Sequence, residues 1–232
     1  MSPKQTGTLA LIGGGEWREG CRDFDADLLA RAGTKEVVVL PTAASFEHPD
    51  RVVDRAAAYF SDLGASVQPL EVLRRADAED RALAERVGHA RFVYVADGSP
   101  LHLRSALKDS ALFDAMVKVY RRGGVVAASG AGATVLCDPM VDPRGGAYTV
   151  GLGIVRDLAV FPYHGTAADH LRERSIDLLP RTATLVGLDE ETALIREPDA
   201  TWRVAGAGVV TVYDGRRTTV VDSGAAVKQL AV

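Results

Sequence analysis

The stretch from Val125 to Leu136 decides the fold of this chain. It reads VVAASGAGATVL and follows Gly123-Gly124. A short apolar run leads into small residues only, and a second apolar run then begins. A buried strand that turns sharply into a helix needs small side chains on both sides of the turn, because the chain doubles back on itself. We therefore expect a strand–turn–helix unit here, called the elbow below.

The small residues of the elbow, Ser129–Ala133, allow two interpretations. A sharp strand-to-helix turn can present a nucleophile, and the N-terminus of the following helix can stabilise negative charge. A Gly/Ala-rich crossover with no chemistry has the same composition. Spacing alone does not separate the two.

The residues before the elbow alternate short apolar runs with amphipathic segments, which predicts parallel strands joined by right-handed helical crossovers. The strands are apolar throughout, as expected for a sheet covered on both faces. Expected strands are Thr8–Ile12, Glu36–Leu40, Val67–Leu73, Phe92–Ala96 and Val125–Ala128. Expected helices are a segment beginning at Asp25–Ala32, then Arg51–Leu63, Ala78–Val87 and Leu112–Tyr120.

After about residue 140 the pattern changes to short strands separated by turns. We interpret this part as an antiparallel extension of the same domain, so that residues 1–232 form a single α/β domain with a doubly wound, mostly parallel sheet. The extension holds one expected helix, Ala168–Leu179. Its expected strands are Leu185–Leu188, Thr192–Ile195, Trp202–Ala205, Val209–Tyr213 and Thr218–Val221.

Composition narrows the possible partners and location. The 232 residues carry a formal charge of −4 with no long basic run, which argues against nucleic acid. No window approaches 18 apolar residues, so we expect no membrane contact. Cys21 and Cys137 are far apart and are expected to be free thiols in a reducing compartment. No signal peptide is recognisable, and the expected location is the cytoplasm.

Ligands of open α/β sheets bind at the carboxyl ends of the strands. Four such ends are unusual here: Gly13–Gly15, Pro41–Ser45, Asp97–Pro100 and Ser129–Ala133. The triple glycine lacks dinucleotide spacing, and no phosphate loop or zinc-like Cys/His spacing is present, so we expect no cofactor and no metal. Among five histidines, His164 is the best candidate base, since it follows an apolar run and precedes a glycine.

Four motifs give the chain a resemblance to a known family, the S51 serine peptidases of the aspartyl dipeptidase and cyanophycinase group. Gly123–Ala133 aligns without a gap with the family's G-[TW]-S-A-G-A elbow, and Gly151–Ile154 matches G-L-G-[IL]. Gly187–Leu194 matches G-x-D-E-x-T-A-L, and the strand in Trp202–Asp214 also fits. The resemblance implies a fold like that of class I glutamine amidotransferases.

The departures from the family fall on its chemistry. The alignment places Gly130 where the family has its nucleophilic serine, and glycine has no side chain that could attack a carbonyl. Asp97-Gly98-Ser99-Pro100 stands where the family has G-G-[ND]-[QT], the loop that contributes oxyanion stabilisation. His164 lies near the family's catalytic histidine, and Asp142 or Asp138 is a candidate to orient it.

Three hypotheses follow. The first is an S51-like protein without the usual peptidase activity, which keeps a cleft for a small peptide or an acidic amino-acid derivative. The second is an active hydrolase in which Ser129 attacks, His164 is the base and Asp142 orients it. The third is a non-catalytic interaction module, and a homodimer is compatible with each. The expected binding residues are Gly14, Asp97, Gly98, Ser99, Gly130 and Ala131.

Overall fold

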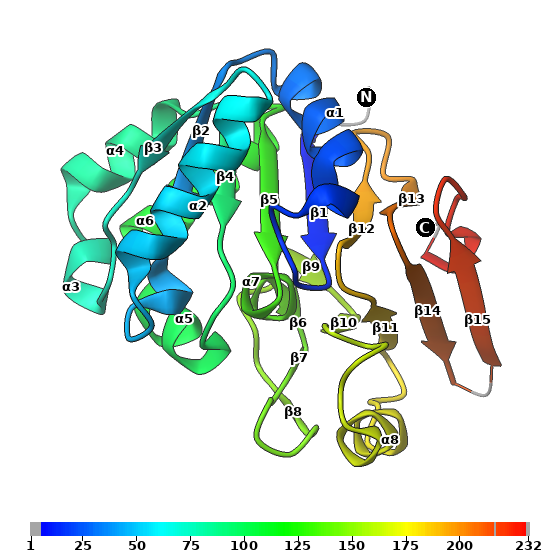
Figure 1. Cartoon of the computed structure of the whole chain (residues 1–232). Coiled ribbons are helices and arrows are strands. Elements are labelled where there is room, and N and C mark those ends of the chain that lie inside the picture. The colour runs from blue at the N-terminus through cyan, green and yellow to red at the C-terminus, as the bar shows by residue number, and fades with distance from the viewer. Residues whose placement is uncertain (1–5, 216, 231–232) are drawn as a thin grey trace, which may run out of the picture.

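A computed structural model of the chain describes residues 6–215 and 217–230. Its largest sheet has seven strands in the order β13-β12-β1-β5-β4-β2-β3 (Figure 1). The first five strands along the chain pair in parallel, while β12 and β13 add to the β1 edge in antiparallel fashion. The strands are β1 (Thr8–Ile12), β2 (Glu36–Leu40), β3 (Ser66–Pro69), β4 (Phe92–Val95), β5 (Val125–Ser129), β12 (Thr192–Arg196) and β13 (Trp202–Gly206).

A second sheet has six strands in the order β15-β14-β11-β10-β6-β9. The late strands are therefore divided between two sheets, and β10 pairs with β11 in parallel. The strands are β6 (Cys137–Asp138), β9 (Val155–Arg156), β10 (Leu158–Phe161), β11 (Thr184–Leu188), β14 (Val209–Asp214) and β15 (Arg217–Asp222). A separate hairpin joins β7 (Met140–Val141) and β8 (Tyr148–Thr149).

Helices cover both faces of the seven-stranded sheet, which confirms the doubly wound, mostly parallel α/β fold. One apolar cluster joins α1 and α2 to one face, and another joins α3–α7 and the second sheet to the opposite face (Figure 1). The helices are α1 (Arg22–Ala32), α2 (Pro49–Asp62), α3 (Arg75–Ala78), α4 (Arg81–His89), α5 (Pro100–Leu107), α6 (Ala111–Arg121), α7 (Ala131–Leu136) and α8 (Asp169–Asp177).

Two helical predictions need correction. The segment expected as one helix, Ala78–Val87, is divided between α3 and α4, because the Asp80 side chain accepts hydrogen bonds from two backbone N–H groups and starts α4. Helix α5 was not predicted. It begins at Pro100, whose missing N–H costs nothing in a first helical turn, and Ser99 caps it.

The elbow forms as expected, at the centre of the large sheet. Strand β5 lies between β1 and β4 and runs into α7 through Gly130. Gly130 has φ 47° and ψ −104°, a backbone conformation that side chains disfavour. Its N–H donates to the Ile12 carbonyl (2.9 Å), which fixes the turn against β1.

Two further observations concern the cysteines and the helices. Cys21 and Cys137 are both free, as the sequence predicts, and both are buried. Within residues 6–215 and 217–230, none of the helices has the length and apolar character needed to span a bilayer.

Candidate ligand site at the elbow

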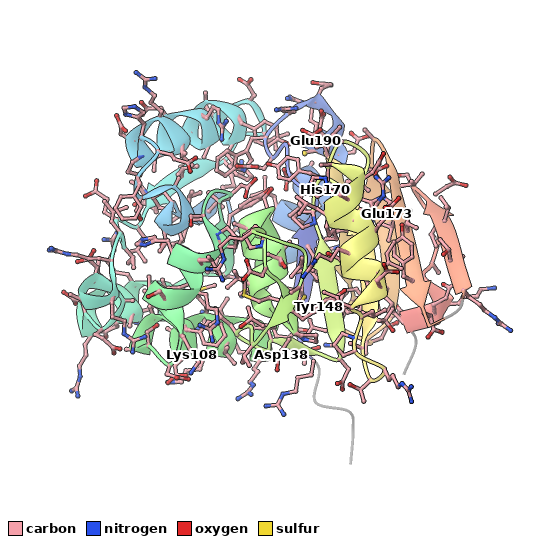
Figure 2. All side chains as sticks on the ribbon, turned by 90° about the horizontal axis from the view of Figure 1, so that it is seen from below. Lys108, Asp138, Tyr148, His170, Glu173 and Glu190 are labelled. Atoms are coloured by element: carbon pink, nitrogen blue, oxygen red, sulfur yellow. The ribbon has the colours of Figure 1, made fainter. Side chains whose placement is uncertain are left out.

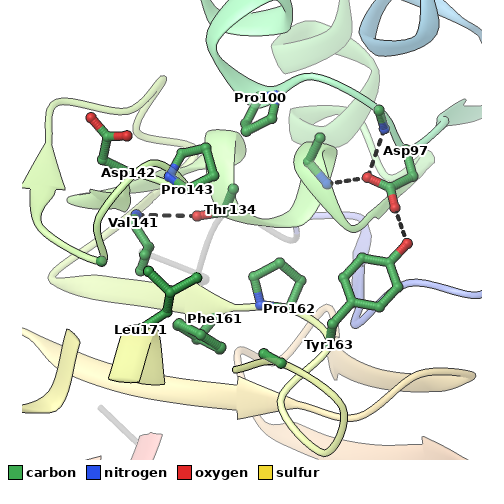
Figure 3. A pocket seen from close by; sticks show the side chains of 14 residues that line it. Asp97, Pro100, Thr134, Val141, Asp142, Pro143, Phe161, Pro162, Tyr163 and Leu171 are labelled. Carbon is green, nitrogen blue, oxygen red and sulfur yellow. Dashed lines mark hydrogen bonds between the residues drawn. The ribbon is translucent and has the colours of Figure 1, made fainter. Parts of the chain in front are cut away.

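The site is organised around the carboxylate of Asp97, the second residue after β4, the strand that neighbours β5. Its Oδ1 accepts the backbone N–H of Gly98 (2.7 Å) and the backbone N–H of Ala131 (2.6 Å). Its Oδ2 accepts the phenolic O–H of Tyr163 (Figure 3). Ala131 follows the tip of the elbow and Gly98 belongs to a separate loop, so two parts of the backbone converge on one oxygen.

Gly130 and Asp97 compete for one volume. A Cβ added to Gly130 would overlap all three atoms of the Asp97 carboxylate group. The positive φ of Gly130 adds backbone strain for any other residue. The space in which a side chain at the tip would lie is therefore filled by a side chain from the neighbouring loop.

Tyr163 completes this arrangement, and the sequence analysis passed over it in favour of the adjacent histidine. It follows β10 with φ 55°, and its N–H donates to the Gly13 carbonyl (2.7 Å). Its ring lies so close to Gly14 that a Cβ there would overlap it. The glycine run after β1 thus leaves the space that this ring occupies. Burial, with the nearby Asp97 charge, raises the pKa of Tyr163, so the phenol remains a donor.

Ser129 forms its hydrogen bond with a residue other than the predicted base. Its hydroxyl is fully buried and donates to Oε2 of Glu16 (2.9 Å). Burial and then the Asp97 charge raise the pKa of Glu16. Alternation along β5 accounts for this direction, since Ser129 and the tip residue cannot project to the same side.

His164 points to the second sheet. Its Nε2 lies 2.7 Å from the Tyr213 hydroxyl, and its Nδ1 lies 3.7 Å from an oxygen of Asp189. The ring packs over Gly187, where a Cβ would overlap it. Burial lowers the pKa of His164 against the opposing effect of Asp189, so the neutral imidazole is favoured near neutrality.

Asp142 has its own partner. Arg144 donates to both of its oxygens, through Nε at 2.9 Å and 3.2 Å, and this bonding lowers the pKa of Asp142. In the structure Ser129 therefore pairs with Glu16, His164 with Tyr213 and Asp142 with Arg144. Ser129, His164 and Asp142 are not brought together.

Three further polar side chains have structural partners. Ser99 accepts the N–H of His102 (3.4 Å) as the cap of α5. Asp138 accepts the N–H of Gly151 (3.1 Å), and Glu190 accepts the Thr166 hydroxyl (3.2 Å). His170 lies on the exposed side of α8 (Figure 2).

A pocket of about 220 Å³ opens beside the Asp97 carboxylate. Gly98, Ala131 and Tyr163 line it together with Asp97, and Asp142 lies at its other end (Figure 3). The lining among the described residues contains no Lys, Arg or His, and the same part of the chain has no group of three His, Cys, Asp or Glu suited to a metal ion. The walls are apolar and consist mainly of Pro100, Val141, Pro143, Phe161, Pro162 and Leu171.

The doubly wound sheet and the central strand–turn–helix elbow define an α/β protein of the hydrolase type. The pattern of peptidase family S51 matches residues 9–202, and the chain belongs to that family. It is 28% identical over 226 residues to a cyanophycinase of Synechococcus elongatus, covering 90% of this chain and 69% of that one. A cyanophycinase of Geminocystis herdmanii is 25% identical over 235 residues, covering 94% and 84%.

A solved structure agrees with this assignment. The crystal structure of a peptidase from an acI-B1 Actinobacterium superposes with a TM-score of 0.86 and 27% identity, covering 96% of each chain.

Proposed function

We propose that this S51 protein binds a small peptide or amino-acid derivative at the elbow and does not cleave it by the family's serine mechanism. The observation that carries the proposal is the Asp97 carboxylate, which accepts the Gly98 and Ala131 N–H groups beside a tip that has no side chain. Two requirements of acyl transfer are affected at once, the nucleophile and the oxyanion site.

The missing nucleophile alone has a large effect. Removing the serine of a catalytic triad costs about a millionfold in rate. Ser129 does not compensate, because its hydroxyl is buried against Glu16 and His164 is engaged with Tyr213.

The filled oxyanion site adds a second barrier. Stabilisation of a tetrahedral intermediate needs N–H donors aimed at the developing oxyanion, and losing one donor costs about a hundredfold to a thousandfold. Here both candidate donors already serve a negatively charged oxygen, so a substrate carbonyl would have to displace Asp97.

A test combines substrate assays with restored residues. In the family pattern glycine stands at the position of Asp97 and serine at that of Gly130. We expect no hydrolysis of Asp-X dipeptides or β-aspartyl-arginine by the natural protein or by Gly130→Ser, whose new side chain meets the Asp97 carboxylate. Slow hydrolysis is expected only in Asp97→Gly/Gly130→Ser, where the tip and its donors are both free.

Ser129→Ala is the matched control. Turnover by the natural protein that this substitution abolishes would overturn the proposal in favour of an active hydrolase using Ser129. Absence of both turnover and small-ligand binding, with a stable protein partner, would instead favour an interaction module.

A further inference from the structure

The pocket at the elbow has an unusual distribution of charge. Two carboxylates line it, and the described lining contains no cationic side chain. One of them, Asp142, is paired with Arg144 and points away from the Asp97 end (Figure 3). An acidic ligand would therefore meet repulsion without a compensating cation.

Asp97 differs from Asp142 because its partners are all neutral. Two backbone N–H groups and one phenol orient the carboxylate, and none of the described Lys, Arg or His side chains forms an ion pair with it. A carboxylate has about four lone-pair positions, and three are used, so Oδ2 can accept one more bond. Since Asp97 lines the pocket, that bond can come from a ligand.

The rest of the pocket favours an apolar body. Three prolines, Val141, Phe161 and Leu171 form its walls. Its volume of about 220 Å³ is below the range of roughly 300–1,000 Å³ typical of pockets for drug-sized molecules. The space suits one side-chain-sized group rather than a long chain.

We propose that the ligand of this pocket carries a primary ammonium on a small apolar body, with the ammonium donating to Oδ2 of Asp97. The inference rests on the proposed function, in which the site binds without serine-dependent cleavage. An ammonium–carboxylate hydrogen bond in a partly desolvated site is stronger than a neutral one. The chemistry is shared by free apolar amines and by the free N-terminus of a peptide that begins with an apolar residue.

Isothermal titration calorimetry on the full chain tests the inference with three ligands that share a phenyl group and differ in charge, which is positive, neutral or negative. Phenethylamine should bind at least tenfold more tightly than 2-phenylethanol, and phenylacetate more weakly than either. Asp97→Asn keeps the shape of the side chain and should lose the preference for the amine. Asp142→Asn, the matched control at the other end of the pocket, should retain it.

A second set of titrations, with peptides, distinguishes the two sources of the ammonium group. If peptides are ligands, Phe-Gly-amide binds and its N-acetyl form does not, whereas binding of phenethylamine alone assigns the site to small amines. Equal affinities for phenethylamine and 2-phenylethanol, or an unchanged preference in a folded Asp97→Asn, would overturn the inference. Cleavage of Phe-Gly-amide, followed by mass spectrometry, would instead overturn the proposed function and leave the charge preference standing.

Discussion

Asp97 at the elbow and Asp25 in α1 lie in two regions that differ in the number of hydrogen-bond donors they offer to a carboxylate. Asp97 accepts three hydrogen bonds and borders a pocket. Asp25 is fully buried in the layer between α1 and the sheet, accepts one bond from Tyr59 (3.0 Å), and its Oδ1 has no partner. Burial raises the pKa of Asp25 to about 8. The two aspartates therefore differ chiefly in the number of hydrogen-bond donors that surround each carboxylate.

The largest expected effect concerns Asp25. The folded-state pKa of about 8 lies above the ordinary value of 3.8, so the folded protein binds an extra proton between these values and loses stability as pH rises through them. The full contribution amounts to about 6 kcal/mol in the free energy of unfolding, and about 4 kcal/mol of it is lost between pH 5 and pH 9. Asp25→Asn should remove this loss, as measured by urea unfolding at pH 5 and pH 9.

Asp23→Asn is the control for this experiment, since it removes one exposed aspartate from the same helix. It should follow the natural protein at both pH values. Parallel pH dependence in Asp25→Asn and the natural protein would contradict the contrast between the two aspartates.

A second prediction tests the shared volume at the elbow. Gly130→Ala should destabilise the protein by about 3 kcal/mol, because the positive φ is unfavourable for alanine and the methyl group overlaps Asp97. In an Asp97→Gly background the cost should fall by about 1–2 kcal/mol, the coupling expected of residues in contact. Chemical denaturation of the four proteins in this cycle measures the coupling, and additive effects would show that the two positions are independent.

The smallest effect concerns the third donor to Asp97. Tyr163→Phe keeps the ring against Gly14 and removes the O–H that donates to Oδ2 of Asp97. A hydrogen bond to a charged group contributes about 2 kcal/mol, so the free energy of unfolding should fall by that amount or less, since the pocket admits water to Oδ2. Urea denaturation at pH 7 is the measurement. A loss above that of Gly130→Ala would mean that the phenol, rather than the backbone donors, holds the carboxylate.

The sequence was sufficient to predict the elbow and the parallel strands, because their apolar runs and small residues are local signals. It did not predict α5, which begins at Pro100, although proline is favourable in a first helical turn. It also suggested one helix where Asp80 divides two. These differences come from capping, which depends on one or two residues.

The proximity of the strand-end residues was predictable from the sequence, but their hydrogen-bond partners were not. Gly14, Asp97, Gly98, Gly130 and Ala131 do lie together, as strand ends on one edge of a parallel sheet should. The bond from Tyr163 to Asp97 spans 66 positions and has no local signal. Likewise, nothing in the residues around His164 indicates that its ring turns to Tyr213.

The close fit between Gly130 and Asp97 has a consequence for how this protein can change. A side chain introduced at the tip meets a carboxylate, and removal of that carboxylate alone leaves two backbone donors without their acceptor and the tip still bare. Introduction of a serine at the tip therefore passes through an unfavourable single substitution by either route. Residues 97 and 130 are therefore expected to change as a pair, because each substitution alone is unfavourable while the other residue is unchanged.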